Sequence, residues 1–147
     1  MLPFLKSATE RCADIGFLFV PRHKHAEHYQ QYGLPDNVIF IHELDAYQSM
    51  AAGDIHTTLN STCALEAPSL GTVNVLMNID NMARKYLEKL LVENESTYYA
   101  SNVDEFCELV RKVPVSDKNL MKSSNSGNIR ENFKSNLKWA IDKIVND

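Results

Sequence analysis

The sequence predicts an α/β domain with a mainly parallel sheet. Two observations support this prediction: continuous apolar runs of strand length recur along the chain, and helical patterns with short links separate them. Continuous apolar runs are typical of strands that are buried on both faces, as they are in parallel sheets. The alternation of strands with helices is typical of βαβ units. We therefore expect a sheet with helices packed on both faces.

The first half of the chain supplies a helix and three strands. The helix is expected over residues 3–14, and the first strand over Gly16–Val20, which Pro21 ends. The second strand is expected over Val38–Ile41 and the third over Asp54–Leu59. Because the first two runs are apolar throughout, both are expected to be buried.

A short helix is expected between the second and third strands. Asp45 begins it, because an aspartate side chain at the N-cap accepts a hydrogen bond from a backbone N–H of the first turn. Gly53 ends the pattern, and Leu44, Tyr47 and Ala51 are expected to face the interior.

The second half of the chain continues the alternation. A fourth strand is expected over Val73–Met77, a helix over residues 81–91 and an extended piece over Thr97–Ala100. Asn102, followed by Glu105, is typical of a helix N-terminus. The helix behind it has an apolar face made of Val103, Phe106, Val110 and Val113.

The C-terminal part of the chain is expected to hold a loop and a last helix. Residues 116–128 are rich in Ser, Asn and Lys and predict a flexible loop. The apolar positions of the last helix are Phe133, Leu137, Ile141 and Ile144. Together the elements predict one three-layer α/β/α Rossmann-like domain over residues 1–147. Ligands of such domains bind beyond the carboxyl ends of the strands.

Composition and charge exclude several classes of protein. The net charge of −4 leaves no basic footprint for nucleic acid. Cys12, Cys63 and Cys107 are odd in number and widely spaced, which argues against a disulfide framework and for a reducing compartment. No signal peptide is evident, and no apolar run approaches the ~20 residues of a membrane-spanning helix. We therefore expect a cytoplasmic protein without a nucleic-acid partner.

Residues 53–71 carry the strongest functional signal. A strand pattern ends in Ser61-Thr62, and a helical pattern follows that Pro68 is expected to kink or shorten. Backbone N–H groups at a helix N-terminus, the helix dipole and two hydroxyls all favour a phosphate. Glu66 lies about one turn further, where a carboxylate can accept a hydrogen bond from a ribose. The alternative is structural: Ser61 is a good N-cap, and Glu66 is a solvated surface acid.

The same segment carries a resemblance to a known family. It is similar to the C-terminal domain of GT-B glycosyltransferases that make bacterial capsule, lipopolysaccharide and other surface polysaccharides. UDP-N-acetylglucosamine 2-epimerases have a similar serine-rich turn and helix, but with Ser-Gly-Gly where this chain has Ser-Thr-Cys. The residues that carry the resemblance are Gly53-Asp54-Ile55, Asn60-Ser61-Thr62, Glu66-Ala67-Pro68, Leu70-Gly71 and the strand Val73–Met77.

The resemblance implies a site for a nucleotide-sugar donor, with no cofactor and no metal. It implies that the donor's phosphates are held after two strands, its ribose by a carboxylate on the short helix, and its base after the second strand. For Arg22 and His23 the alternative is a solvated basic face, and for Asp45 a helix cap. The residues implied are Ser61, Thr62, Arg22 and His23 for the phosphates, Glu66 for the ribose, and His42 and Asp45 for the base region.

A GT-B enzyme places its active site between two domains, so we expect this chain to be one half of such an enzyme. The N-terminal acceptor domain, or a partner chain, would supply the other half, and the residues that the resemblance implies in this chain bind the donor and include no catalytic residue. The resemblance also allows a peripheral membrane association of the complete enzyme. Two alternatives stay open: half of a nucleotide-sugar 2-epimerase or hydrolase, and a non-catalytic module that binds a nucleotide or a partner protein.

One further motif has metal-ligand spacing. His23, His25, Glu27 and His28 follow the first strand in a pattern that resembles the metal motif of metallo-β-lactamases. Imidazoles at this spacing can share a zinc ion. That fold requires further ligands downstream, and His42 and His56 do not stand in the expected context. We therefore expect no metal site.

Overall fold

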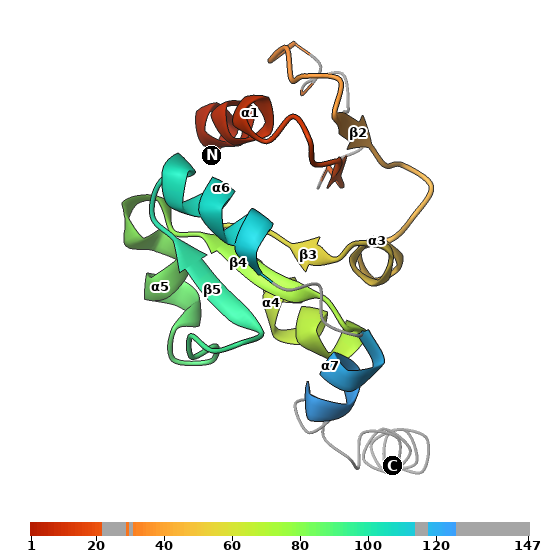
Figure 1. Cartoon of the computed structure of the whole chain (residues 1–147), viewed down its shortest axis with the longest axis vertical. Coiled ribbons are helices and arrows are strands. Elements are labelled where there is room, and N and C mark those ends of the chain that lie inside the picture. Colours follow the sequence, from red (N-terminus) through yellow and green to blue (C-terminus); the bar gives the residue numbers. More distant parts are fainter. Residues whose placement is uncertain (22–28, 30, 114–117, 126–147) are drawn as a thin grey trace, which may run out of the picture.

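The computed structural model describes residues 1–21, 29, 31–113 and 118–125. Within these ranges the chain alternates helices with short parallel strands (Figure 1). The elements are α1 (Leu2–Arg11), β1 (Phe17–Phe19), β2 (Val38–Phe40), α3 (Ala46–Ala52), β3 (Ile55–His56), α4 (Cys63–Glu66), the 3-10 helix η1 (Ala67–Leu70), β4 (Val73–Met77), the 3-10 helix η2 (Ile79–Asn81), α5 (Met82–Leu87), β5 (Thr97–Ala100), α6 (Val103–Lys112) and α7 (Lys118–Asn125).

The described strands form two small parallel sheets. β1 pairs with β2, and β3, β4 and β5 form a second sheet in that order. In the second sheet His56 lies opposite Asn74, which in turn lies opposite Thr97. The prediction of a mixed α/β chain with parallel strands is therefore confirmed.

Helices pack on both faces of the β3–β4–β5 sheet. Val73, Val75 and Met77 of β4 belong to a core shared with α1 and α6. Leu76 points the other way, into a second core with Ala64 of α4 and with α5. All of β4 is buried, which explains why its sequence shows no polar alternation apart from one asparagine. Figure 1 shows α1 and α6 on one side of this sheet and α4 and α5 on the other.

Asn37, which directly precedes β2, links the β1–β2 sheet to α1 by hydrogen bonds. The Asn37 side-chain amide donates to the backbone oxygens of Thr9, Cys12 and Ile15, at 3.0, 3.0 and 2.9 Å. These contacts satisfy carbonyl groups at and beyond the C-terminal end of α1, which a helix leaves free. On the opposite side of this sheet, Leu18 and Ile39 lie side by side in register and are 43% and 54% exposed, so the expectation that both strands are buried is wrong for this face.

Helix α3 begins and ends where the sequence predicts, but it buries a different face. Asp45 is its N-cap and forms a capping box with Gln48, and Gly53 is its C-cap. The expectation that Leu44, Tyr47 and Ala51 face the interior is wrong, because all three are exposed. The buried residues of α3 are Ser49 and Met50. The reason is that α3 packs against η1, a neighbour that its own sequence does not reveal.

The third strand is shorter than predicted, since only Ile55–His56 has regular strand geometry. Its pairing with β4 nevertheless continues on either side. The Asp54 oxygen accepts from the Val73 N–H at 3.2 Å, and the Thr58 oxygen accepts from the Met77 N–H at 2.9 Å. Other predicted bounds agree closely: β4 and β5 match the predicted strands, and Asn102 caps α6 with its side chain.

The prediction of a loop over residues 116–128 is wrong where the structure describes the segment, because Lys118–Asn125 is α7. Tertiary contacts override the loop-like composition. Met121 is buried in the core shared with α1 and α6, and the Lys118 ammonium donates to the Gly53 oxygen at 2.9 Å. The predicted last helix, with Phe133, Leu137, Ile141 and Ile144, lies outside the described residues.

None of the helices in the described part of the chain has both the length and the apolar character that a membrane crossing requires.

Candidate functional site

Parallel pairing brings the carboxyl ends of three strands to one edge of the sheet, which we call the carboxyl edge. It is made by residues 57–62 after β3, 78–81 after β4 and 101–102 after β5. The segments after β4 and β5 are in contact, since the Asn78 amide donates to the Ser101 hydroxyl at 3.4 Å. Open α/β sheets bind ligands at this edge. Two of the predicted phosphate ligands, Ser61 and Thr62, lie there.

Ser61 and Thr62 bring two hydroxyls to the start of α4. Thr62, rather than Ser61, occupies the N-cap position, and its exposed side chain makes no capping hydrogen bond. The Ser61 hydroxyl instead accepts from the Cys63 N–H at 3.3 Å. Ser61 therefore binds a backbone N–H at the start of the helix, as its structural alternative predicts, but it is not the N-cap residue. The Thr62 hydroxyl does not cap the helix.

The helix that follows is short. α4 has four residues and passes directly into η1, where Pro68 stands in the first turn. The left-handed Gly71 ends η1 at a φ of 84°. The expected effect of Pro68 on the helix agrees with this geometry. Four residues give only a small dipole, so an anion at this end would depend on hydroxyls and cationic side chains more than on the helix.

Glu66 contacts a residue that the sequence assigned to the protein interior. The Tyr47 hydroxyl donates to the Glu66 carboxylate across 3.3 Å, which joins α3 to α4. The negative charge of Glu66 raises the pKa of Tyr47, and the hydrogen bond between the two adds to this effect. Tyr47 is 53% exposed. The structure therefore presents a carboxylate and a phenol side by side at the surface.

His42 and Asp45 lie in the exposed link between β2 and α3. The Asp45 carboxylate accepts from the Gln48 N–H at 2.8 Å, and the Gln48 side chain accepts from the Asp45 N–H at 3.0 Å. The His42 N–H donates to the Glu43 carboxylate at 3.4 Å. Asp45 therefore caps α3, which is the structural alternative given for it above. His42 contacts its neighbour Glu43.

Arg22 and His23 lie outside the described residues, as does the whole His23-x-His25-x-Glu27-His28 motif. The structure therefore does not place the predicted cationic part of the phosphate site. Among the residues that it does describe, no group of three or more His, Cys, Asp or Glu side chains is arranged to hold a metal ion.

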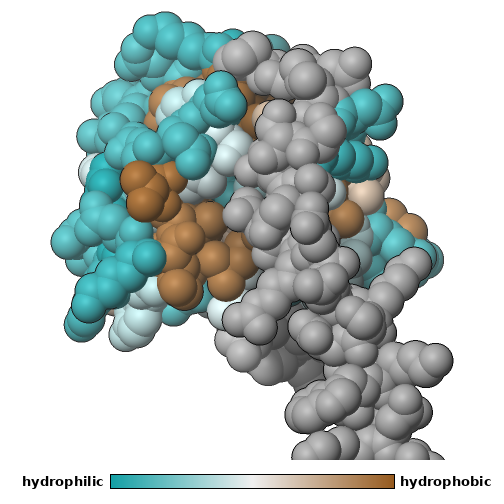
Figure 2. Space-filling model, turned by 90° about the horizontal axis from the view of Figure 1, so that it is seen from below, coloured by the Kyte–Doolittle hydropathy of each residue, from teal (hydrophilic) through white to brown (hydrophobic). Residues whose placement is uncertain are grey.

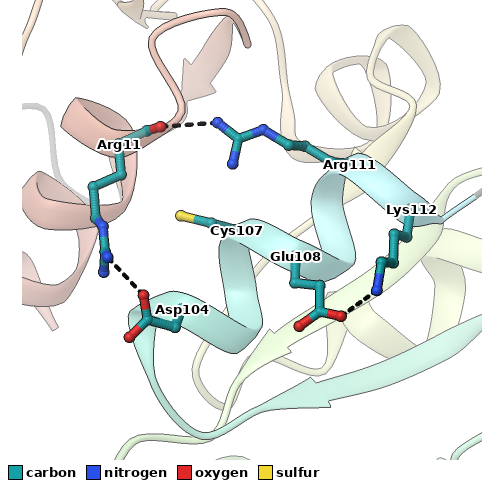
Figure 3. Close-up of a pocket in the computed structure, with 6 residues that line it drawn as sticks. All are labelled: Arg11, Asp104, Cys107, Glu108, Arg111 and Lys112. Carbon is teal, nitrogen blue, oxygen red and sulfur yellow. Dashed lines mark hydrogen bonds and ion pairs between the residues drawn. The ribbon is translucent and has the colours of Figure 1, made fainter.

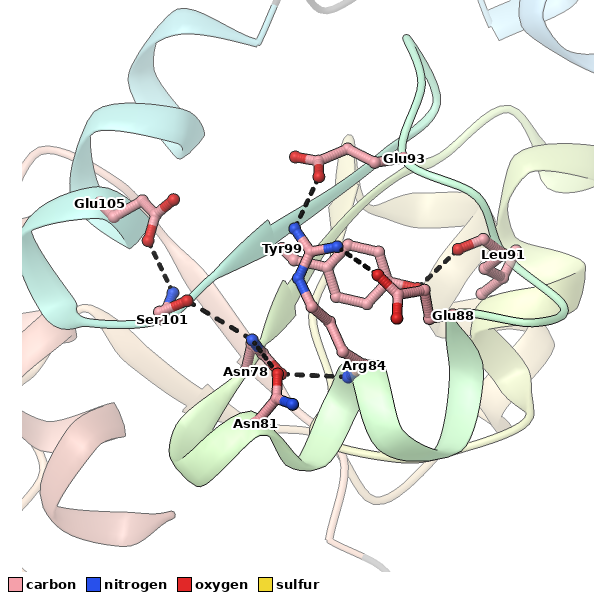
Figure 4. Close-up of polar contacts among 9 residues, drawn as sticks. All are labelled: Asn78, Asn81, Arg84, Glu88, Leu91, Glu93, Tyr99, Ser101 and Glu105. Carbon is pink, nitrogen blue, oxygen red and sulfur yellow. Dashed lines mark hydrogen bonds and ion pairs between the residues drawn. The ribbon is translucent and has the colours of Figure 1, made fainter.

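Sequence reasoning missed a polar cluster at the carboxyl edge (Figure 4). The Asn78 oxygen accepts from the Arg84 N–H at 3.0 Å, and its amide nitrogen donates to Asn81 at 3.2 Å. Asp80 and Asn81 both have positive φ, at 49° and 60°. Such a conformation is uncommon for residues other than glycine. The signal in the sequence was an Asn- and Asp-rich turn placed directly after a buried strand.

A second missed cluster is buried inside the sheet. His56, Asn74 and Thr97 occupy adjacent register positions on β3, β4 and β5, and hydrogen bonds connect them. Burial lowers the pKa of His56, and the hydrogen bond to Asn74 opposes that effect. The only sign of this cluster in the sequence is Asn74, a polar residue in the middle of an apolar run.

A surface hollow between α1 and α6 has a volume of about 400 Å³ (Figure 3). Its charged residues are already paired. Arg11 contacts Asp104 at 2.6 Å, Arg111 contacts Asp14 at 3.0 Å, and Lys112 contacts Glu108. Cys107 forms the remaining part of the lining and is a free thiol. Because its charges neutralise one another, this hollow is a poorer candidate for a nucleotide than the carboxyl edge.

No family model matches the chain, and no curated protein matches it.

Proposed function

We propose that this chain is the donor-nucleotide-binding domain of a GT-B glycosyltransferase that makes a surface polysaccharide or glycolipid. In this proposal the chain is a three-layer Rossmann-like domain, and its donor lies across the carboxyl edge. The observation that carries the proposal is the contact between Glu66 and Tyr47. It brings the half-buried Glu66 carboxylate and the exposed Tyr47 phenol together, and Glu66 lies in the same short helix that Ser61 and Thr62 precede.

Each group in the proposed site has a chemical role. The hydroxyls of Ser61 and Thr62 donate to phosphate oxygens, and Arg22 and His23 supply positive charge to the leaving phosphate. Glu66 accepts from the ribose hydroxyls. Tyr47, which donates to Glu66 in the free protein, is positioned to orient that carboxylate or to contact the base.

The proposal includes a second domain or partner chain that completes the active site. Support comes from the outward side of the β1–β2 sheet, where Leu18 and Ile39 are exposed. Parallel sheets usually have both faces covered, so an open apolar face favours a further covering element. The complete enzyme would transfer the sugar, and the chain alone would bind the donor weakly.

An amide NMR titration with UDP, CDP, GDP and CMP tests the proposal. Saturable shifts centred on residues 60–66 are expected with one of these nucleotides, and they would identify the base. Thr62→Ala should weaken the binding, because it removes a hydroxyl without removing a capping bond. Ser101→Ala is the control, since it removes a hydroxyl from the same edge that is not assigned to the phosphates or the ribose. Unchanged amide chemical shifts of residues 60–66 with all four nucleotides at millimolar concentration would contradict the proposal.

A further inference from the structure

Asn74 is an unusual residue for its place in the fold. It lies in the middle of the central strand β4 and is fully buried, at 0% exposed, among the apolar residues Val73, Val75 and Leu76. Burying an amide without hydrogen bonds is strongly unfavourable. The structure offsets this cost by giving Asn74 a partner on each side.

The three partners come from three different elements. The Asn74 amide nitrogen donates to the Ala64 backbone oxygen at 2.7 Å and to the Thr97 hydroxyl at 3.3 Å. The Asn74 oxygen lies 2.9 Å from Nδ1 of His56. A primary amide has two N–H donors, and Ala64 and Thr97 use both. The Asn74 oxygen must therefore accept, which makes Nδ1 of His56 the protonated nitrogen of the ring.

The bond to Ala64 is the one that reaches the candidate site. Ala64 lies in α4, two residues after Thr62 and two before Glu66. α4 has only four residues, and isolated helices of this length are not stable in water. Its position therefore depends on contacts with the sheet, and the Asn74–Ala64 bond is the shortest hydrogen bond of the Asn74 network.

We propose that Asn74 is a positioning residue that holds α4, and with it Thr62 and Glu66, at a fixed height above the sheet. His56 has the second part of this role: its Nδ1–H fixes the orientation of the Asn74 amide, so that the nitrogen faces Ala64. This inference rests on the proposed function in one respect, namely that the residues of the α4 segment contact the donor.

A plain core residue in place of Asn74 would fill the space without fixing α4. It would also leave the Ala64 oxygen, the Thr97 hydroxyl and His56 without their partner, and an unpaired buried polar group is unfavourable. Leucine has the same branching as asparagine, is bulkier, and has no hydrogen-bonding groups. Asn74→Leu should therefore lower the free energy of unfolding and release α4, and the release counts as local only where α4 changes more than the rest of the sheet.

Amide hydrogen exchange measures the release without any ligand. In Asn74→Leu the amides of Ala64, Leu65 and Ala67 should exchange roughly tenfold faster than in the wild type, and by a larger factor than those of β5. Ala64 and Leu65 donate to the oxygens of Ser61 and Thr62, so their exchange reports on the start of α4. Thr97→Val is the matched control, since it removes the weaker, 3.3 Å partner of Asn74 and leaves the bond to Ala64 in place.

Asn74→Asp is the second variant, in case leucine prevents folding. Aspartate keeps the shape of the side chain and the oxygen that faces His56, but its ionised form has no donor for the Ala64 oxygen. The same faster exchange in α4 is expected. Nitrogen-15 shifts of the imidazole should show the Nδ1–H form of His56 in the wild-type protein and lose it in Asn74→Leu.

The outcomes separate this inference from the proposed function. Unchanged α4 exchange in both Asn74 variants would overturn the positioning role, whatever the nucleotide titration shows. Faster exchange in α4, with a roughly tenfold loss of nucleotide affinity, would support both. Faster exchange together with a wild-type protein that binds no nucleotide would support the positioning role and contradict the proposed function.

Discussion

Asp45, Asn102 and Thr62 all stand at the start of a helix, but they use their side chains differently. Asp45 and Asn102 each accept a hydrogen bond from a backbone N–H of the first turn, and Thr62 makes no such bond. A capping side chain is occupied by the fold, whereas an uncapped hydroxyl stays available to a ligand. This difference allows the structural and the binding interpretations of each residue to be tested separately.

Replacing Asn102 or Thr62 with alanine should affect different properties of the protein. Asn102→Ala should lower the free energy of unfolding by about 1 kcal/mol, because it removes the 2.9 Å bond to the Glu105 N–H. Thr62→Ala should leave stability within about 0.5 kcal/mol and reduce nucleotide binding instead. Urea unfolding measures the first effect and the NMR titration the second. Equal losses of stability in the two variants would contradict the assignment of Thr62 to the ligand.

The Tyr47–Glu66 contact can be detected through the phenol. The negative charge of Glu66 raises the pKa of Tyr47. Glu66→Gln removes that charge, so the pKa of Tyr47 should fall toward its ordinary value of 10.0. An ultraviolet titration of the tyrosinate band, with Tyr47→Phe used to assign the signal, measures the change. A Tyr47 pKa that Glu66→Gln leaves unmoved would show that the two side chains are apart in solution.

His56 should make stability depend on pH. Burial lowers its pKa below the ordinary 6.5, so the folded protein binds fewer protons at this ring than the unfolded chain does. The stability from the neutral ring is complete above pH 6.5 and is lost as the pH falls through 6.5 toward the lower folded pKa. Urea unfolding at about pH 7.5 and pH 5.5 should show this loss in the wild type and a smaller one in His56→Asn. Equal losses in both proteins would rule out His56 as the cause.

At the scale of whole elements, prediction from the sequence succeeded where the signal was local. β4 and β5 are apolar runs bounded by turn residues, and α6 has a capping side chain and a strong 3.6-residue period. It failed where packing between distant segments decides the outcome. α7 has a loop-like composition and is held by contacts to Gly53 and to η1, while the buried face of α3 is set by η1.

The junction between η1 and α7 gives a test at this scale. Gly71 has a φ of 84°, and a Cβ there would lie 2.8 Å from the Lys118 oxygen. Gly71→Ala should therefore destabilise the fold through both backbone strain, about 1–2 kcal/mol, and a collision with α7. Thermal unfolding measures the loss.

Two other glycines separate these causes. Gly33 also has a positive φ, 57°, but a Cβ there meets only the Lys6 ammonium at 3.8 Å. Gly33→Ala should show the strain without the collision. Gly16 has open space around it, and Gly16→Ala should be nearly neutral. A Gly71→Ala variant no less stable than Gly33→Ala would mean that α7 does not pack against Gly71.

At the scale of the whole molecule, apolar surface is distributed unevenly. Seen from below, an apolar patch interrupts a largely hydrophilic surface (Figure 2). Leu90 and Val92, in the link after α5, are 64% and 69% exposed, and Leu18 and Ile39 form the open face of the β1–β2 sheet. Apolar side chains in contact with one another at a surface favour association with another surface.

The open face of the β1–β2 sheet should promote self-association of the isolated chain. Leu18→Ser combined with Ile39→Ser should lower the sedimentation-derived association constant, while leaving the fold intact because both side chains are exposed. The paired change Leu90→Ser and Val92→Ser is the control for apolar exposure elsewhere. An equal reduction by both double variants would indicate non-specific adhesion and not a docking face.

The candidate site was predicted only in part. The sequence indicated Ser61, Thr62 and Glu66 because they stand in one continuous turn and helix. It did not indicate Tyr47 as a partner of Glu66, nor the support of α4 by Asn74. Both contacts join residues that are well separated along the chain, and pattern reasoning within one segment cannot detect them.

The bonds of Lys118 also have a consequence for the order of assembly. Its ammonium reaches the oxygens of Ala51 and Gly53 at the end of α3, across more than sixty residues of chain. Contacts between such distant residues form late, because closing a long loop is entropically costly. During synthesis the chain through β5 therefore emerges before α7 is available to secure the end of α3. The surface that carries Tyr47 should reach its final form only when α7 has left the ribosome.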